Sequence, residues 1–90
     1  MYSLEFTNQY LRDLKLVRKR NFDEQKLNQV IHILITGNKL PKQYYNHILT
    51  GFYKGLNECH ISPDWLLIYS KDKTIKLIKL IRTGTHSDLF

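Results

Sequence analysis

Three of the four histidines, His47, His60 and His86, lie in or beside predicted turns and close to other polar residues. Histidine has an unperturbed pKa of about 6.5, so its imidazole can both accept and donate a proton near neutral pH. Histidines that converge on one phosphate can supply the base and the acid of RNA cleavage. The base removes the 2′-hydroxyl proton, the freed oxygen attacks the adjacent phosphate, and the acid protonates the leaving 5′-oxygen.

Two acidic residues could assist His60. Glu58 and His60 are two residues apart in a predicted strand, so their side chains point to the same face. Cys59, between them, points to the opposite face, where we expect a small core residue. Asp64 follows in a turn, where it could orient a histidine or cap the turn. We therefore take Glu58 and Asp64 as candidate members of the catalytic group.

Cationic and aromatic side chains could contact an RNA substrate. Arg82 begins a polar group at a strand end, where it could stabilise the charge of a phosphorane-like transition state or form a surface ion pair. Trp65 could stack on a base or anchor the core. Phe90, the last residue, could stack on a nucleobase or pack lightly at the chain end. Lys54 is a further candidate for substrate binding.

Other site chemistries match the sequence poorly. There is no CxxC or HExxH pair, and Cys59 and His60 face opposite ways in a regular strand. The four glycines are scattered and form no phosphate-binding loop. We therefore predict a site without a metal ion or a cofactor.

The N-terminal half predicts one strand and two helices. Residues 2–6 alternate as a short strand, and Thr7 or Asn8 can cap a helix that runs to about Arg20. Asp23 can cap a second helix, whose apolar residues recur at positions 27, 30, 31 and 34. Gly37 ends this helix by adopting the left-handed conformation. The short link between the helices predicts an antiparallel hairpin.

The C-terminal half predicts an antiparallel meander. Residues 56–61, 65–70 and 74–82 read as strands, with turns at 62–64 and 71–73 between them. Residues 38–54 are polar and irregular, and a short tail follows Gly84. The fold class is therefore α+β, with the helical hairpin packed on one face of a three- to four-stranded antiparallel sheet. The other face is expected to be open to a ligand.

Size and charge limit the class of protein. Ninety residues predict a single domain spanning 1–90, and one cysteine allows no internal disulfide. The net charge of +6 favours a polyanionic partner such as RNA. No apolar run is long enough for a signal peptide or a membrane span, so we expect a cytoplasmic protein without membrane contact.

Three motifs together resemble the YafQ branch of the RelE/ParE toxin superfamily. The first is a histidine in a short loop before a glycine, at residues 46–51. The second is His-Ile-Ser-Pro-Asp-Trp-Leu-Leu-Ile-Tyr at residues 60–69, and the third is Arg-Thr-Gly-Thr-His-Ser-Asp-Leu-Phe at residues 82–90. The resemblance extends over the whole chain in layout and over about half of it in motif. It implies the α+β fold expected above and the activity of an mRNA-cleaving toxin.

The resemblance also implies roles for individual residues. Three histidines match positions assigned to mRNA cleavage, an aspartate assists them, an arginine meets phosphate, and two aromatic residues contribute to activity or substrate contact. These residues are His47, His60, Asp64, Trp65, Arg82, His86 and Phe90. His86 is implied as the most central acid or base. The role of Glu58 depends on strand parity alone, because the branch does not share this residue.

The resemblance further implies partners and leaves an alternative. Members are held inactive by a small antitoxin, and the complex often represses its own operon, so operator DNA is expected as a partner only through that complex. The mRNA could be cleaved free or on the ribosome. ParE-like relatives share the fold but inhibit DNA gyrase, and they generally lack the histidine set. The three histidines favour the nuclease over this alternative and over a non-catalytic nucleic-acid-binding repressor.

Overall fold

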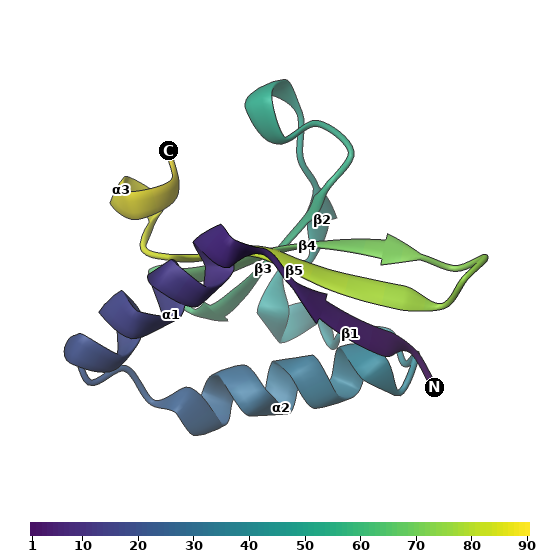
Figure 1. Cartoon of the computed structure of the whole chain (residues 1–90), viewed down its shortest axis with the longest axis horizontal. Helices are drawn as coiled ribbons and strands as arrows, with labels where there is room; N and C mark the ends of the chain where they lie inside the picture. Colours follow the sequence, from purple (N-terminus) through teal and green to yellow (C-terminus); the bar gives the residue numbers. More distant parts are fainter.

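The computed structural model describes residues 1–90 and contains one five-stranded sheet in the order β1-β5-β4-β3-β2. Figure 1 shows α1 and α2 below this sheet, and α3 with the segment around β2 above it. In chain order the elements are β1 (Ser3–Phe6), α1 (Asn8–Lys19), α2 (Glu24–Ile35), η1 (Lys42–Tyr44), β2 (His47–Ile48), η2 (Gly51–Tyr53), β3 (Asn57–Ser62), β4 (Trp65–Asp72), β5 (Leu77–Gly84) and α3 (His86–Leu89). The α+β class and the central meander are confirmed.

The sheet is larger than predicted, and it is mixed. β1 pairs in parallel with β5, from Ser3 opposite Leu77 to Phe6 opposite Leu80, whereas the other pairs are antiparallel. β2 adds a fifth strand of two residues beside β3. A strand this short has no periodicity to recognise. The turn between β4 and β5 lies at residues 73–76, later than the predicted 71–73, because β4 continues to Asp72.

The helix boundaries follow the predicted capping residues. The Thr7 side chain accepts a hydrogen bond from the Tyr10 N–H at the start of α1, and Asp23 accepts from the Gln25 N–H at the start of α2. Gly37, just after α2, has φ of +82°. The two helices diverge from their short link as they cross beneath the sheet (Figure 1).

Both faces of the sheet carry a hydrophobic core. The larger core lies between the two helices and the sheet and includes Tyr10, Val30, Trp65 and Leu80. On the opposite face, Leu89 of α3 packs on buried residues of β4, and side chains from residues 49–56 cover their edge. The expectation of an open second face is therefore wrong for this region, and only the remainder of that face is free for a ligand.

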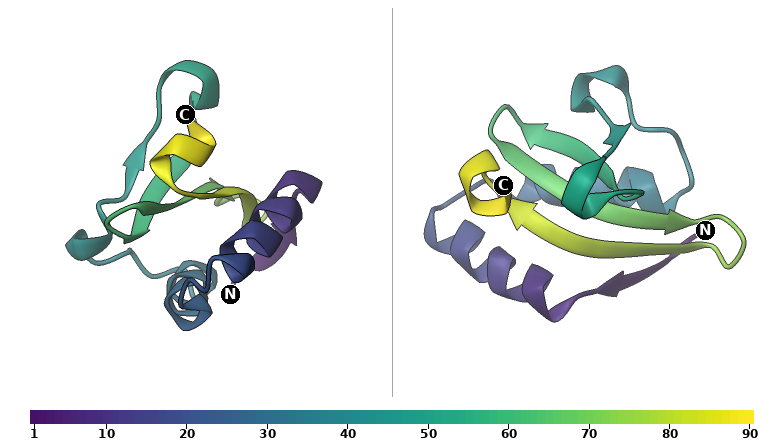
Figure 2. Two further views of the ribbon diagram at one scale, coloured as in Figure 1. Left: turned by 90° about the vertical axis from the view of Figure 1, so that its left-hand side faces the viewer. Right: turned by 90° about the horizontal axis from the view of Figure 1, so that it is seen from above.

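The C-terminal residues form a helix instead of a tail. Thr85 and Asp88 make reciprocal hydrogen bonds, a capping box that fixes the start of α3. Asp88 also forms an ion pair with Arg20 at the end of α1, with 2.6 Å between Nη1 and Oδ2. Figure 2 shows α3 turned back over the end of the sheet. None of the helices has the length and apolar character needed to cross a membrane.

Candidate active site

Two of the predicted histidines share one buried carboxylate. β2 pairs with β3 so that His47 lies opposite Glu58, and Glu58 and His60 lie on the same face of β3. Oε1 of Glu58 is 3.2 Å from Nε2 of His47 and 3.9 Å from Nε2 of His60. The glutamate side chain is 5% exposed, whereas the two imidazoles are 50% and 29% exposed. The carboxylate therefore forms the floor of the site, and the two rings reach solvent above it.

Only one oxygen of the Glu58 carboxylate has polar neighbours. Its Oε2 is buried and has no hydrogen-bond partner. Buried polar atoms without a partner are rare, because their lost hydration is not replaced. Oε1 is therefore the carboxylate oxygen through which Glu58 faces the two histidines. This arrangement links the carboxylate to the proton positions of His47 and His60.

The loop before β2 orients the His47 ring. Nδ1 of His47 is 2.9 Å from the carbonyl oxygen of Tyr45, and because a carbonyl can only accept, this contact assigns a proton to Nδ1. Tyr45 has φ of +49° and ψ of +44°, a left-handed conformation that is unusual for an aromatic residue. The neighbouring Asn46 accepts a hydrogen bond from the Tyr69 hydroxyl across the sheet. Nε2 of His47 is thereby directed at Glu58.

His86 lies at the start of α3 and is fixed through its backbone. Oδ1 of Asp64, in the turn between β3 and β4, accepts a hydrogen bond from the His86 N–H at 3.1 Å. The ring of His86 lies against that of Phe90, with centroids 5.0 Å apart. Phe90 in turn meets the ring of Tyr53 edge-on at 5.5 Å. Asp64 therefore positions the helix that carries His86; its hydrogen bond is to the backbone, not to an imidazole.

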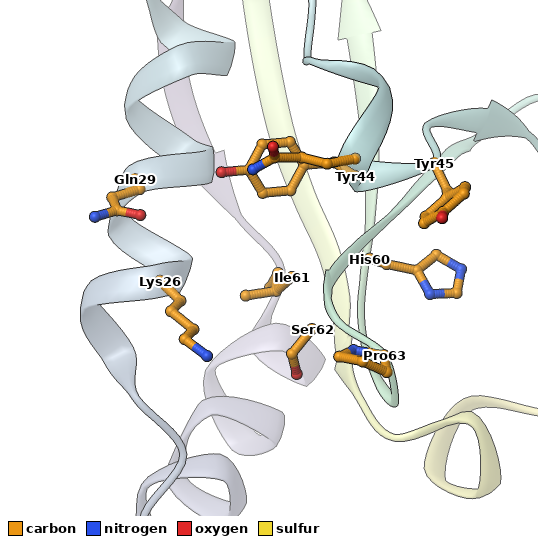
Figure 3. Close-up of a pocket in the computed structure, with 9 residues that line it drawn as sticks. Lys26, Gln29, Tyr44, Tyr45, His60, Ile61, Ser62 and Pro63 are labelled. Atoms are coloured by element: carbon orange, nitrogen blue, oxygen red, sulfur yellow. The ribbon is translucent and has the colours of Figure 1, made fainter.

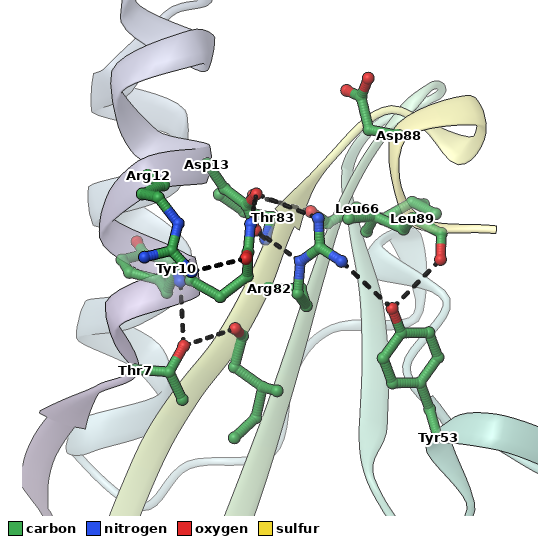
Figure 4. Close-up of polar contacts among 12 residues, drawn as sticks. Thr7, Tyr10, Arg12, Asp13, Tyr53, Leu66, Arg82, Thr83, Asp88 and Leu89 are labelled. Carbon is green, nitrogen blue, oxygen red and sulfur yellow. Dashed lines mark hydrogen bonds and ion pairs between the residues drawn. The ribbon is translucent and has the colours of Figure 1, made fainter.

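Arg82 forms a partly buried ion pair (Figure 4). Its Nε and Nη2 donate to the two carboxylate oxygens of Asp13 on α1, at 2.8 and 3.1 Å. The hydrogen bond with Asp13 raises the pKa of the Arg82 guanidinium above its ordinary value. Nη1 is 3.5 Å from the Tyr53 hydroxyl, which donates to the Leu89 carbonyl of α3. Arg82 is thus fixed between α1 and α3, with one side of the guanidinium directed at Tyr53.

The β3 residues Glu58 and His60 and the helix α3 lie on the same face of the sheet. Register places Glu58 opposite Ile68 and His60 opposite Leu66, and directly paired residues share a face. Leu66 and Ile68 are the residues on which Leu89 of α3 packs. The helix that carries His86 therefore packs on the same face of the sheet that carries Glu58 and His60.

The remaining predicted residues separate into core and surface. Trp65 is 2% exposed, its Nε1 donates to the Thr83 hydroxyl at 2.9 Å, and its ring packs against Phe22. Trp65 is therefore the core anchor, and the indole has no free face for a base. Phe90 is 57% exposed. Lys54 is exposed at the end of η2.

Three contributors were missing from the sequence-based site: Asp13, Tyr45 and Tyr53. A signal existed for Asp13, which lies three residues after Tyr10 and four before Val17, on the buried stripe of α1. A carboxylate on an apolar stripe requires a buried partner. Tyr45 and Tyr53 lie in the irregular segment, where no pattern predicted their neighbours. No cluster of three or more His, Cys, Asp or Glu side chains is arranged to hold a metal ion.

Comparison with known proteins found similar sequences and similar folds. The family described as "Bacterial toxin of type II toxin-antitoxin system, YafQ" matches residues 2–90. The mRNA interferase toxin YafQ of Escherichia coli K12 is 43% identical over 88 residues, which cover 97% of this chain and 94% of the relative. The crystal structure of YafQ from E. coli BL21(DE3) is 37% identical with a TM-score of 0.92, covering 100% of this chain and 99% of that one. The E. coli DinJ-YafQ complex gives 38% identity and a TM-score of 0.91, with the same coverage.

Proposed function

The chain belongs to the YafQ family of bacterial type II toxins, and we propose on this basis that it is an endoribonuclease that cleaves mRNA and thereby inhibits translation. The observation that carries the proposal is the buried Glu58 carboxylate with the Nε2 atoms of His47 and His60 at 3.2 and 3.9 Å from one oxygen. The site has proton-transfer groups on a solvent-facing surface, next to the helix that carries His86.

In the proposed reaction, histidines supply both proton transfers. An imidazole beside a carboxylate is stabilised when it takes up a proton, which favours His60 as the base that activates the 2′-hydroxyl. Both ring nitrogens of His47 already face acceptors, the Tyr45 carbonyl and Glu58. The freed 2′-oxygen attacks the adjacent phosphorus, and the bond to the 5′-oxygen breaks. His86, on the facing helix, protonates that leaving oxygen. The products are a 2′,3′-cyclic phosphate and a 5′-hydroxyl end, and no metal ion takes part.

Arg82, Phe90 and Lys54 supply further contacts to the RNA in the proposed site. The ion pair with Asp13 holds the guanidinium in place, so that its Tyr53-facing side can stabilise charge on the phosphate. Phe90 is exposed and lies against His86, where it can stack on a base next to the cut. Lys54, on the same covering segment as Tyr53, adds a cation for the RNA backbone.

The proposed partners follow from the same family. The E. coli relative has been solved with DinJ, and we expect this chain to be held inactive by a cognate antitoxin of its own. Operator DNA is then a partner of that complex and not of the toxin alone. The toxin acts in the cytoplasm, where its mRNA substrate is found.

The test is to incubate the purified chain with a defined mRNA in EDTA, with and without ribosomes, beside His86→Ala. Cuts that carry 5′-hydroxyl ends, and that disappear in the variant, would support the proposal. The ribosome arm decides whether the mRNA must be engaged in translation. Absence of cuts in both arms, from a protein that still halts growth, would replace the proposal with gyrase inhibition of the ParE type. Cuts that require added metal would overturn the metal-independent mechanism.

A further inference from the structure

A groove opens beside the candidate active site (Figure 3). It has a volume of about 730 Å³ and lies between α2, the η1 segment and the edge of β3. Its lining includes Lys26, Gln29, Gln43, Tyr44, Tyr45 and His60. β2 pairs only with Asn57 and Glu58, so beyond them the edge of β3 that borders the groove has no neighbouring strand. A volume of several hundred Å³ is the size of a small-molecule site and accommodates one nucleotide.

The lining has the chemistry of a nucleotide site. It contains one ammonium group, two amides that can both donate and accept, and two tyrosine rings, but no Asp or Glu. Lys26, Gln29 and Gln43 make no side-chain hydrogen bond or ion pair within the chain, so their polar groups are free for a ligand. An anionic ligand with a flat, hydrogen-bonding ring satisfies each of these groups.

Tyr45 connects the groove to the histidines. Tyr45 is 68% exposed, and its ring meets the His60 ring edge-on, with centroids 5.7 Å apart. Its carbonyl accepts from Nδ1 of His47. A base stacked on Tyr45 therefore lies next to both imidazoles. The left-handed backbone at Tyr45 serves both contacts, since it sets the carbonyl and the ring in their directions.

We propose that this groove binds the nucleotide next to the scissile phosphate and reads its base. Tyr45 supplies the stacking surface, Gln29 and Gln43 hydrogen-bond the base edge, and Lys26 contacts a phosphate. The inference rests on the proposed ribonuclease function, because it places the reacting phosphate over His47 and His60. It assigns sequence preference to the side of His60 that faces α2.

The experiment compares groove variants with matched controls outside the groove. The groove variants are Tyr45→Asn, Gln29→Ala with Gln43→Ala, and Lys26→Gln; asparagine is chosen because it tolerates the left-handed backbone. Tyr45→Phe is the conservative groove variant that keeps the ring, and the controls outside the groove are Gln25→Ala and Lys73→Gln. Cleavage of an RNA library randomised around the cut gives base preference. Binding is measured by anisotropy with 2′-O-methyl RNA, which has no nucleophile and cannot be cut. Circular dichroism verifies that each variant is folded.

Stacking is worth enough that Tyr45→Asn should weaken binding by about 5- to 150-fold, while Tyr45→Phe retains it. The double glutamine variant should flatten the base preference at one position beside the cut and raise KM more than it lowers kcat. Lys26→Gln should reduce the log–log salt slope by about 0.7. The two controls outside the groove should match the wild type.

Two results would overturn the groove assignment. One is wild-type base preference and affinity in all groove variants. The other is unchanged RNA binding with weakened binding of the antitoxin, which would make the groove a protein-binding surface. A wild type that binds 2′-O-methyl RNA through the groove but cuts no RNA would refute the ribonuclease proposal while supporting the RNA site. The two proposals therefore fail separately.

Discussion

Glu58 is buried, and only one of its two carboxylate oxygens has a polar partner. At the scale of single residues, this is the feature that separates the site from an ordinary pair of surface histidines. Strand parity was sufficient to predict that Glu58 and His60 share a face, and the structure confirms it. The proximity of His47 was not predictable, because it depends on the register of a two-residue strand.

Glu58→Gln is expected to lower kcat by about tenfold or more, where tenfold is less than the roughly 10²–10⁴-fold contribution of a group that transfers the proton itself. Glutamine keeps the shape of the side chain but removes the charge that directs and stabilises the two imidazoles. KM should change less than threefold, because Glu58 is buried and does not touch RNA. Single-turnover cleavage measures the effect, with Glu5→Gln, an exposed glutamate on β1, as the control.

Glu58→Asp should restore part of the rate lost in the glutamine variant, since it restores the charge. If the Glu58→Gln variant cleaves at the wild-type rate, the carboxylate has no catalytic role. If aspartate is as slow as glutamine while both variants are folded, position matters more than charge.

Cys59 provides a second prediction at this scale. It lies in the core between the helices and the sheet, and burial raises the pKa of its thiol to about 12. The reactive thiolate is therefore almost absent near neutral pH. We expect iodoacetamide to leave the folded protein unmodified and to label it fully in denaturant. We also expect Cys59→Ala to retain the cleavage rate, and rapid labelling of the native protein would contradict the burial.

Trp65 shows where residue-level reasoning was too coarse. Its place between a turn and a strand allowed either stacking on RNA or packing in the core, and strand alternation now explains the outcome. Trp65, Leu67 and Tyr69 are alternate residues of β4 and all point into the helical core. The family position is therefore compatible with a structural role, exerted through the hydrogen bond to Thr83 beside Arg82.

At the scale of elements, α3 is the part of the site that sequence periodicity could not predict. Four residues are too short for a helical pattern. A signal was nonetheless present, because Thr85 and Asp88 have the spacing of a capping box. Gly84 is also required, since a Cβ there would approach Oδ2 of Asp88 to 2.9 Å. The helix is thus specified by Gly84 and Thr85 before it and by Asp88 within it.

The Arg20–Asp88 ion pair should control how firmly α3 is held. The hydrogen bond from Arg20, with that from the Thr85 backbone, lowers the pKa of Asp88 below its ordinary value of 3.8. A carboxyl whose pKa is lowered on folding adds stability above its unfolded pKa and loses it as pH falls toward the folded pKa. The contribution is therefore complete at neutral pH and declines below about pH 4. The pair is partly exposed, so its net worth is modest.

Asp88→Asn and Arg20→Gln are both expected to reduce cleavage several-fold, because α3 carries His86 and Phe90. Amide hydrogen exchange should be faster in residues 86–90 of both variants and little changed in β4. Arg18→Gln breaks the exposed pair with Glu24, which does not involve α3, and serves as the control. Wild-type exchange and activity in the two variants would show that Asp64 and the capping box suffice to hold α3.

At the scale of the whole molecule, local patterns predicted the elements but not their distant pairings. The meander of β3, β4 and β5 was predictable because its strands are consecutive and joined by short turns. The pairing of β1 with β5 joins the two ends of the chain, and no local pattern encodes it. The same holds for Arg82 and Asp13, 69 residues apart, whose contact decides how the arginine is oriented.

The positive charge of the molecule should make its affinity for RNA depend on salt concentration. Three arginines, Arg18, Arg20 and Arg82, are in ion pairs with carboxylates. The net charge of +6 therefore comes from cations outside these pairs. The other cations are left to attract RNA phosphates and release their counterions. For three or more contacts on single-stranded RNA, the log–log slope of affinity against salt should be about −2 or steeper. Anisotropy titrations with 2′-O-methyl RNA between 50 and about 300 mM salt measure it.

The distribution of this charge makes the prediction specific. If phosphates follow the groove toward the histidines, Lys26→Gln should make the slope shallower by about 0.7, whereas Lys73→Gln, in the turn between β4 and β5 at the end of the sheet away from α3, should not. Equal effects of the two variants would mean that the net charge attracts RNA without a defined path. A slope near zero would mean that RNA binding is not electrostatic, and the cationic surface would then have a different partner.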